Sequence, residues 1–572
     1  MPKPGCLVHF VSALTANVTL LSSAVLLSLL EFRQEKRGTR FWWPAAPIPL
    51  SACAFFFLAG LAFIPRLGVE DDEALFAWPW YRPRGQFWAL YIGHTRLPIM
   101  LISYLGALKS WIYRPIFRLF GTGVDVLRLP MLFAGAVTVW LFYCLLRRVA
   151  GERAAWIGCG LLATDAIYLL SSIFDWGPVV LQHLLIVGGT LLLVRFWQER
   201  RDALLGWGFA LLGLAAWDKA LAFWSLGGFG VATLITLRSQ IRELWTARRL
   251  RLALAGFALG ALPLIVYNVD SGLGSFRGNA VYDSSLLPKK LYVLKMTFDG
   301  SGLFGWLVAE DRDTPSPHTP RGGLEISSAK VASWAGNPHR DFLLYAFAAA
   351  LLLAPLARGP DRRAIGFALI AMAVAWCQMA FTAGTGGAQH HTILLWPLPQ
   401  MVIAVSFAAA SRRLGRAGVP VLATVTLVVI GSGLAVINQY YTEAVRNGGD
   451  RNWTDALYRL SDYLKATPAP YMACVDWGIL DSLRLLGSGK LPLLNWELGG
   501  AEPSSEDRQI MARLIADPRN LFLGHTSSAE VNRGTETWIL HFAEAASYRR
   551  EMLTVISDSY GRPSLEVYRF VR

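Results

Sequence analysis

The sequence predicts an α-helical polytopic membrane protein with about 11–13 spans and a small C-terminal α/β domain. Of its 572 residues, 54% are hydrophobic and only 16% are charged, whereas soluble domains carry roughly 25% charged residues. Apolar runs of near-spanning length recur between residues 11 and 437. Residues 440–572 mix polar and apolar positions, with strand-like and helical stretches in turn.

The net charge of +14 lies in short loops between the apolar runs. Six of these loops hold 21 Lys and Arg against 7 Asp and Glu: 31–40, 147–153, 195–202, 238–251, 358–363 and 411–418. Short, Arg-rich loops between spans are typical of the cytoplasmic side of a membrane. The basic charge therefore predicts topology and argues against a nucleic-acid partner.

Placing the six basic loops inside predicts twelve spans with both termini outside. These spans fall at roughly 11–30, 49–65, 129–146, 155–172, 178–196, 204–217, 221–237, 251–269, 342–357, 364–382, 392–410 and 419–437. We interpret 11–30 as a retained anchor, since it lacks a clear small-residue cleavage site.

Three parts of the chain follow from this pattern. Residues 1–44 form an anchor helix and a basic loop, 45–439 a transmembrane domain, and 440–572 an extracytoplasmic α/β domain. The long outer loop 66–128 contains semi-apolar stretches interrupted by basic residues. This pattern predicts helices that lie in the membrane interface.

Three carboxylates of the acidic run EDDE, Asp71, Asp72 and Glu73, open the first outer loop within the sequence GVEDDEALFAW. Helix capping explains one or two of them, with Asp72 starting a short helix. A general base or a metal-binding cluster at the interface would explain all three. This segment alone leaves both interpretations open.

Further polar residues fall on the predicted outer side. Asp175 ends one span, Lys219 lies between two spans, and His390 and His391 open another. A charge in a tight hairpin can reach water without any function, and a His pair is more often interfacial than metal-binding. Acids and bases gathered on one membrane face nevertheless indicate a site for interfacial catalysis.

The order of these short motifs resembles the GT-C glycosyltransferases. The resemblance is greatest to the family 39-like branch, which includes protein O-mannosyltransferases and the aminoarabinose transferases of lipid A. It covers most of 45–440 and rests on DDEALF (71–76), RLP (96–98), FDWGPVVLQHLL (174–185), WDKAL (217–221) and GAQHHTILLWP (387–397).

This resemblance implies a hexosyl- or pentosyltransferase of a bacterial inner membrane. It implies inverting transfer of a sugar from a polyprenyl-phosphate donor to a lipid, glycan or protein acceptor on the outer face. Asp72 would be the general base, with Glu73 beside it. Asp71 adds a third acid, so the base could be displaced by one residue.

The same resemblance implies roles for the other polar residues. Arg96 and Lys219 would bind the lipid phosphate, and Asp175 would position a substrate. His390 and His391 would join the substrate site. The activated donor needs no further energy source, in agreement with the absence of a phosphate-binding loop motif. A divalent cation remains possible if the acids and histidines meet.

The sequence also bears on two other classes of function, a transporter or flippase and a non-catalytic scaffold. A transporter or flippase of a lipid-linked substrate would place ionisable residues at mid-depth in its spans and show repeated halves. The sequence shows no internal repeat, and its charges gather at the outer ends. A non-catalytic scaffold would leave the outer acids and cations unexplained.

Overall fold

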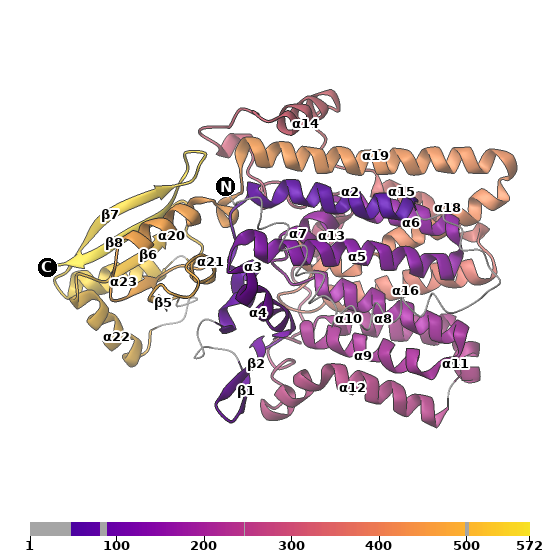
Figure 1. The fold of residues 1–572 in the computed structure, drawn as a ribbon, viewed down its shortest axis with the longest axis horizontal. Coiled ribbons are helices and arrows are strands. Elements are labelled where there is room, and N and C mark those ends of the chain that lie inside the picture. The colour runs from indigo at the N-terminus through magenta and orange to yellow at the C-terminus, as the bar shows by residue number, and fades with distance from the viewer. Residues whose placement is uncertain (1–46, 81–87, 245, 498–502, 533) are drawn as a thin grey trace.

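The computed structural model describes residues 47–80, 88–244, 246–497, 503–532 and 534–572. A bundle of long helices occupies one side of the molecule, and a five-stranded sheet with its helices lies against one end of that bundle (Figure 1). We call this end the sheet end. The predicted anchor 11–30 lies outside the described residues.

Most helices belong to the bundle or to its turns at the far end. They are α2 (Pro47–Phe63), α5 (Val124–Ala150), α6 (Glu152–Ala163), α7 (Ala166–Ile173), α8 (Val180–Glu199), α9 (Asp202–Asp218), α10 (Ala222–Thr236), α11 (Arg238–Leu244), α12 (Ala247–Asp270), α15 (Leu343–Leu353), α16 (Gly359–Ala380), α18 (Leu398–Arg413) and α19 (Gly415–Asn447).

Shorter elements connect these helices. They are η3 (Ile64–Arg66), α3 (Asp71–Ala74), η4 (Leu75–Trp80), β1 (Trp88–Ile92), β2 (Thr95–Ile102), β3 (Leu105–Gly106), α4 (Leu108–Phe120), α13 (Leu287–Phe298), η5 (Asp311–Asp313), α14 (Gly323–Trp334), η6 (Ala354–Leu356), α17 (Gln389–Thr392) and η7 (Ile393–Leu395).

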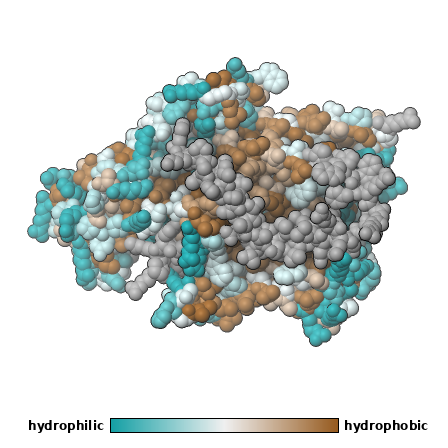
Figure 2. Space-filling view, in the orientation of Figure 1, coloured by the Kyte–Doolittle hydropathy of each residue, from teal (hydrophilic) through white to brown (hydrophobic). Residues whose placement is uncertain are grey.

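The protein is a multi-pass membrane protein. Within the described residues, seven helices are long and apolar enough to cross a membrane, or eight if α6 and α7, which meet at a 60° bend, form one span. This count is lower than the predicted 11–13, because α9, α10 and α15 are shorter than a straight span requires. Figure 2 shows hydrophilic residues over the sheet end and the opposite end of the bundle.

Small residues allow the backbones of neighbouring helices to approach closely. A methyl group on Gly256 of α12 would lie 2.3 Å from the carbonyl oxygen of Gly206 in α9, and one on Gly260 would lie 2.1 Å from that of Ala210. Close approach through small residues is the usual basis of helix packing in membranes. It brings the end of α12 to a defined position beside β2 and that of α9 beside β3.

The first long loop contains more strand than predicted. Residues 95–106, predicted as interfacial helix, form β2 and β3 of a three-stranded antiparallel sheet with β1. The predicted interfacial helix is found only after these strands, as α4. Four consecutive residues of β2, 98–101, are buried between exposed Thr95 and Ile102, so both faces of the strand are covered there.

The C-terminal region is the α/β unit that the sequence predicts. It comprises η8 (Arg451–Trp453), α20 (Ala456–Ala466), β4 (Met472–Cys474), α21 (Leu480–Leu486), β5 (Leu493–Asn495), α22 (Ser505–Ala516), β6 (Leu521–His525), α23 (Thr535–Ala545), β7 (Arg549–Ser557) and β8 (Pro563–Val571). The strand order is β5-β4-β6-β8-β7, with β5, β4 and β6 parallel and β8 antiparallel to both neighbours.

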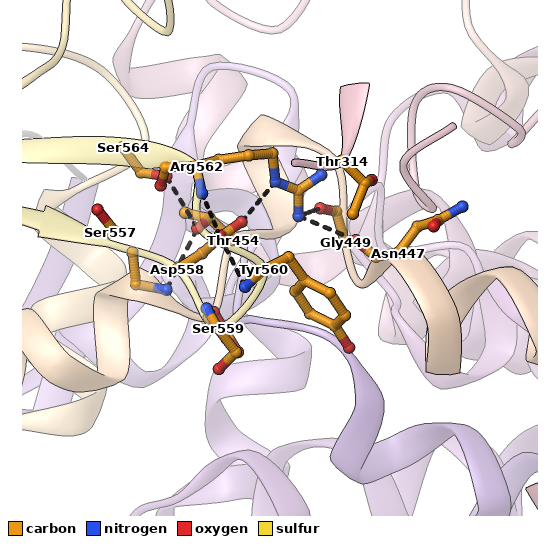
Figure 3. A network of polar contacts seen from close by, with 12 residues as sticks. Thr314, Asn447, Gly449, Thr454, Ser557, Asp558, Ser559, Tyr560, Arg562 and Ser564 are labelled. Carbon is orange, nitrogen blue, oxygen red and sulfur yellow. Dashed lines mark hydrogen bonds and ion pairs between the residues drawn. The ribbon is translucent and has the colours of Figure 1, made fainter. Parts of the chain in front are cut away.

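A polar network fixes the C-terminal region to the end of α19 (Figure 3). Arg562 binds Asp558 at 2.6 Å and donates to the carbonyls of Asn447 and Gly449 at 3.0 and 2.8 Å. The ring of Tyr560 lies against Gly448, where a methyl group would approach it to 2.2 Å. The sheet therefore has a fixed position at its end of the bundle.

Candidate active site

The acidic segment forms the short helix α3 at the sheet end. Its N-cap is Glu70, whose carboxylate accepts the N–H of Glu73 at 3.0 Å. The helix therefore begins at Asp71, one residue before the start that the sequence predicts. With Glu70, four consecutive carboxylates lie in the site. Glu70 makes the capping interaction that the sequence offered as an explanation for the other acids.

Glu73 is committed to a buried ion pair. Its two carboxylate oxygens lie 2.7 and 2.9 Å from nitrogens of Arg128, and both side chains are at most 1% exposed. Arg128 also donates to the carbonyls of Ile64 and Gly68 at 2.8 and 2.6 Å. This pair attaches α3 to the start of α5 and gives Glu73 a structural role.

Asp71 and Asp72 differ in their partners. Asp71 is buried and accepts the N–H of Asp481 in α21 at 2.8 Å, so it joins α3 to the C-terminal region. Asp72 is half-buried, and no hydrogen bond to its carboxylate is found among the described residues. Burial and the charge of Asp71 raise the pKa of Asp72 to about 7, while the charge of Lys219 acts in the opposite direction.

One turn, FDWGP, assembles the cationic side of the site. Asp175 lies 2.8 Å from the ammonium of Lys109 and caps α8 by accepting the N–H of Val179 at 2.8 Å. The carbonyl of Gly177 accepts from the Lys219 ammonium at 2.5 Å. Asp175 is therefore paired within the protein, and Lys219 follows α9 with its ammonium held at the turn.

The same turn holds the two histidines. Trp176 donates its indole N–H to Nδ1 of His390 at 2.9 Å, and the rings of His390 and His391 lie 4.1 Å apart. A methyl group on Gly177 would approach His390 to 2.5 Å, so only glycine allows this packing. Both histidines thus lie at the FDWGP turn, where the Gly177 carbonyl accepts from the Lys219 ammonium.

Two predicted features gain no support from these contacts: phosphate binding by Arg96 and a metal site. Arg96 is half-buried in β2, where its backbone pairs with Tyr91 of β1, and its phosphate-binding role stays a prediction. Within the described ranges, no group of three or more His, Cys, Asp or Glu is placed to hold a metal ion. In α3, Glu73 pairs with Arg128, and Asp71 accepts a hydrogen bond from α21.

Sequence reasoning missed four charged residues of the site. Lys109 and Arg128 are buried partners of predicted acids, and Asp218 is fully buried with both carboxylate oxygens lacking a described hydrogen bond. Glu70 caps α3. A signal was present for two of them, because Lys109 and Arg128 interrupt apolar stretches where an unpaired charge would be costly.

An apolar cavity of about 150 Å³ begins beside this site. Its lining follows α8 from Gln182 and His183 past Ile186 and Thr190 to Val194. The amide of Gln182 donates to the backbone carbonyl of Lys219 at 3.2 Å. At 1.5 Å per residue this lining extends about 18 Å along the helix.

The comparisons with known proteins agree with this arrangement. Residues 107–267, which include the FDWGP turn and Lys219, match the family described as dolichyl-phosphate-mannose-protein mannosyltransferase. No curated protein matches the sequence.

Among solved structures, ArnT from Cupriavidus metallidurans bound to undecaprenyl phosphate aligns at a TM-score of 0.55 and 12% identity, covering 91% of this chain and 97% of that chain. The apo oligosaccharyltransferase of Archaeoglobus fulgidus aligns at a TM-score of 0.47 and 13% identity, covering 86% of this chain and 70% of that chain. The chain therefore has the fold of the GT-C glycosyltransferases of the ArnT type, and the resemblance predicted from its sequence is confirmed.

Proposed function

We propose that the protein is an inverting glycosyltransferase that moves a sugar from a polyprenyl-phosphate donor to a lipid, glycan or protein acceptor. Residues 45–439 would be the catalytic transmembrane domain, with 440–572 as a domain beside it. The observation that carries the proposal is that the charge of Lys219 acts on Asp72, a carboxylate without a described hydrogen bond, while Gln182 of the apolar cavity donates to the Lys219 carbonyl.

In this reaction Asp72 removes the proton from an acceptor hydroxyl or amine. The acceptor atom bonds to C1 of the sugar while the bond from C1 to the phosphate oxygen breaks, and the phosphate leaves with the electron pair. A positioned carboxylate supplies the base. Lys219 neutralises the leaving phosphate, since only one of its three N–H donors is used at Gly177.

Two observations support the donor class. The ArnT that shares this fold was crystallised with undecaprenyl phosphate, and the cavity along α8 offers an apolar groove for the first isoprene units of such a lipid. Its lining begins beside Lys219, at the place where a phosphate would be held.

The distribution of charge supports the side of the membrane. The Arg-rich loops around α11 and between α18 and α19 lie at the end of the bundle away from the sheet (Figure 1). By the positive-inside bias that end is cytoplasmic. The site and the C-terminal sheet would then face the extracytoplasmic side of a bacterial inner membrane.

Transfer in detergent tests this proposal. Purified protein given a radiolabelled polyprenyl-phosphate sugar and acceptor should release polyprenyl phosphate without any sealed compartment. Lys219→Met should lower this release at least tenfold, and Lys465→Met, which removes an exposed lysine of α20, should not. A lipid-linked substrate that moves only across sealed vesicles would point instead to a transporter or flippase.

The rate of transfer should rise with pH through about 7. Asp72 acts as a base only when ionised, and its raised pKa of about 7 leaves it largely protonated below that value. A pH profile of kcat/KM measures the effect. Asp72→Asn should remove this limb from the residual activity, and a profile that stays flat in the parent protein would exclude Asp72 as the base.

A further inference from the structure

The strand order of the C-terminal sheet has a switch point between the carboxyl ends of β4 and β6, and we call this position the crevice. The chain leaves β4 through α21 to reach β5 on one side, and it leaves β6 through α23 toward β7 and β8 on the other. The two connections depart in opposite directions from neighbouring parallel strands. Open α/β sheets bind ligands in the crevice outside the carboxyl ends of strands at such a point.

Two buried side chains meet in this crevice. Asp476 follows β4 and His525 ends β6, and their Oδ2 and Nδ1 atoms lie 2.8 Å apart with side-chain exposures of 3% and 8%. Asp476 also accepts the N–H groups of Val531 and Asn532 at 2.9 and 2.8 Å. Because a carboxylate only accepts, the pair places a proton on Nδ1, and in the neutral imidazole Nε2 is then a hydrogen-bond acceptor.

Nε2 of His525 has no hydrogen-bond partner among the residues that the structure describes. Beside the ring lies Gly478, at which a methyl group would stand 3.7 Å from Cε1, so the backbone there closes one side of the crevice. The His525 side chain is 8% exposed, and a ring nitrogen that is oriented in this way and has no described partner is suited to a ligand.

Hydrogen bonds connect the crevice to helix α3 through α21. Helix α21, which follows β4, donates from Asp481 to Asp71 at 2.8 Å and from Ser482 to the carbonyl of Val69 at 3.1 Å. Glu497 follows β5, and burial together with Asp71, Asp476 and Asp72 raises its pKa to about 7. Glu497 and α21 therefore connect the dyad with the acidic segment that contains the proposed base.

We propose that His525, oriented by Asp476, is a binding residue for the acceptor, and that the crevice takes an acceptor whose reacting end carries hydroxyl or ammonium groups. This proposal rests on the proposed glycosyl transfer. Nε2 of His525 and the carboxylates of Asp72 and Glu497 are hydrogen-bond acceptors, so their complement is a donor. A phosphate group presents only acceptor oxygens and negative charge there.

Matched sugars test the acceptor class directly. Saturation-transfer NMR would follow methyl glucoside, glucosamine and glucose 6-phosphate on the full chain in phosphatidylcholine nanodiscs. The hydroxyl and ammonium probes should bind, and the phosphate probe should bind at least tenfold more weakly. Equal binding of glucose 6-phosphate, or no binding of any probe to the parent protein, would overturn the proposal.

Three variants identify the residues. His525→Ala and Asp476→Asn should each weaken probe binding at least tenfold, whereas His525→Gln should keep part of it, because its amide oxygen can reach the position of Nε2. The control is His541→Ala, an exposed position of α23. If His525→Ala binds the probes like the parent, or His525→Gln loses as much as His525→Ala, the dyad only supports the fold.

The affinity for undecaprenyl phosphate separates this proposal from the proposed function. That affinity should be unchanged in His525→Ala and reduced in Lys219→Met. A parent protein that binds no undecaprenyl phosphate contradicts glycosyl transfer, while unchanged probe binding in His525→Ala contradicts the acceptor site alone.

Discussion

Replacing Asp72 with asparagine is expected to lower the turnover of transfer by about 10²–10⁴-fold, the usual contribution of a general base. Asparagine has nearly the same shape but cannot take a proton from the acceptor. Since no hydrogen bond to the Asp72 carboxylate is described, the exchange should leave α3 in place. Single-turnover release of radiolabelled sugar measures the loss, and binding of undecaprenyl phosphate should not change.

The matched control is Asp71→Asn. Asp71 accepts an N–H from Asp481, and an asparagine oxygen can still accept it, so most of the turnover should remain. The reverse result, with loss at Asp71 and little effect at Asp72, would place the base one residue earlier. Loss of expression in Asp72→Asn, without a turnover defect in folded protein, would favour a capping role.

Much of the site could be predicted because its motifs are local. The acids of α3, the FDWGP turn and Lys219 each occupy a few consecutive residues, and the count of charges in the loops predicts their side of the membrane. The prediction that these motifs share one membrane face required only the alternation of spans. The structure adds that Gly177 joins two of these motifs by accepting from Lys219 and packing on His390.

Pairings between distant residues could not be predicted from one sequence. Glu73 and Arg128 are separated by 55 positions, and Asp71 and Asp481 by 410. Local spacing marks neither partner, so it does not distinguish the roles of Asp71, Asp72 and Glu73. The structure assigns Glu73 to an ion pair and Asp71 to a domain contact, and it leaves Asp72 as the acid without a described hydrogen bond.

The short elements were mispredicted for a related reason. Apolar stretches such as 95–106 have no turn signal that separates a strand from an interfacial helix, and β2 is recognised only by its pairing with β1 and β3. The sheet order of the C-terminal region was equally inaccessible. It is this order that brings Asp476 and His525 together, which their sequence positions do not suggest.

Replacing Arg128 with methionine is expected to destabilise the protein by about 3–5 kcal/mol, because it leaves the Glu73 carboxylate buried without its partner. Three backbone carbonyls, at Ile64, Leu67 and Gly68, lose their donor as well. Unfolding in detergent, followed by intrinsic fluorescence, measures the loss. The control Arg569→Met breaks the half-exposed pair with Glu551 on the outer sheet edge and should cost under about 1 kcal/mol.

The double variant Glu73→Leu with Arg128→Met separates stability from positioning. Replacing both members of a buried ion pair with apolar residues removes the uncompensated charge and often restores stability. Turnover should remain low, because α3 loses the contact that fixes Asp72 relative to Lys219. Recovery of turnover together with stability would show that the pair serves only the fold. If Glu73 itself carried the proton, Glu73→Gln would abolish the rise of activity through pH 7, whereas a positioning residue would lower the rate and keep that rise.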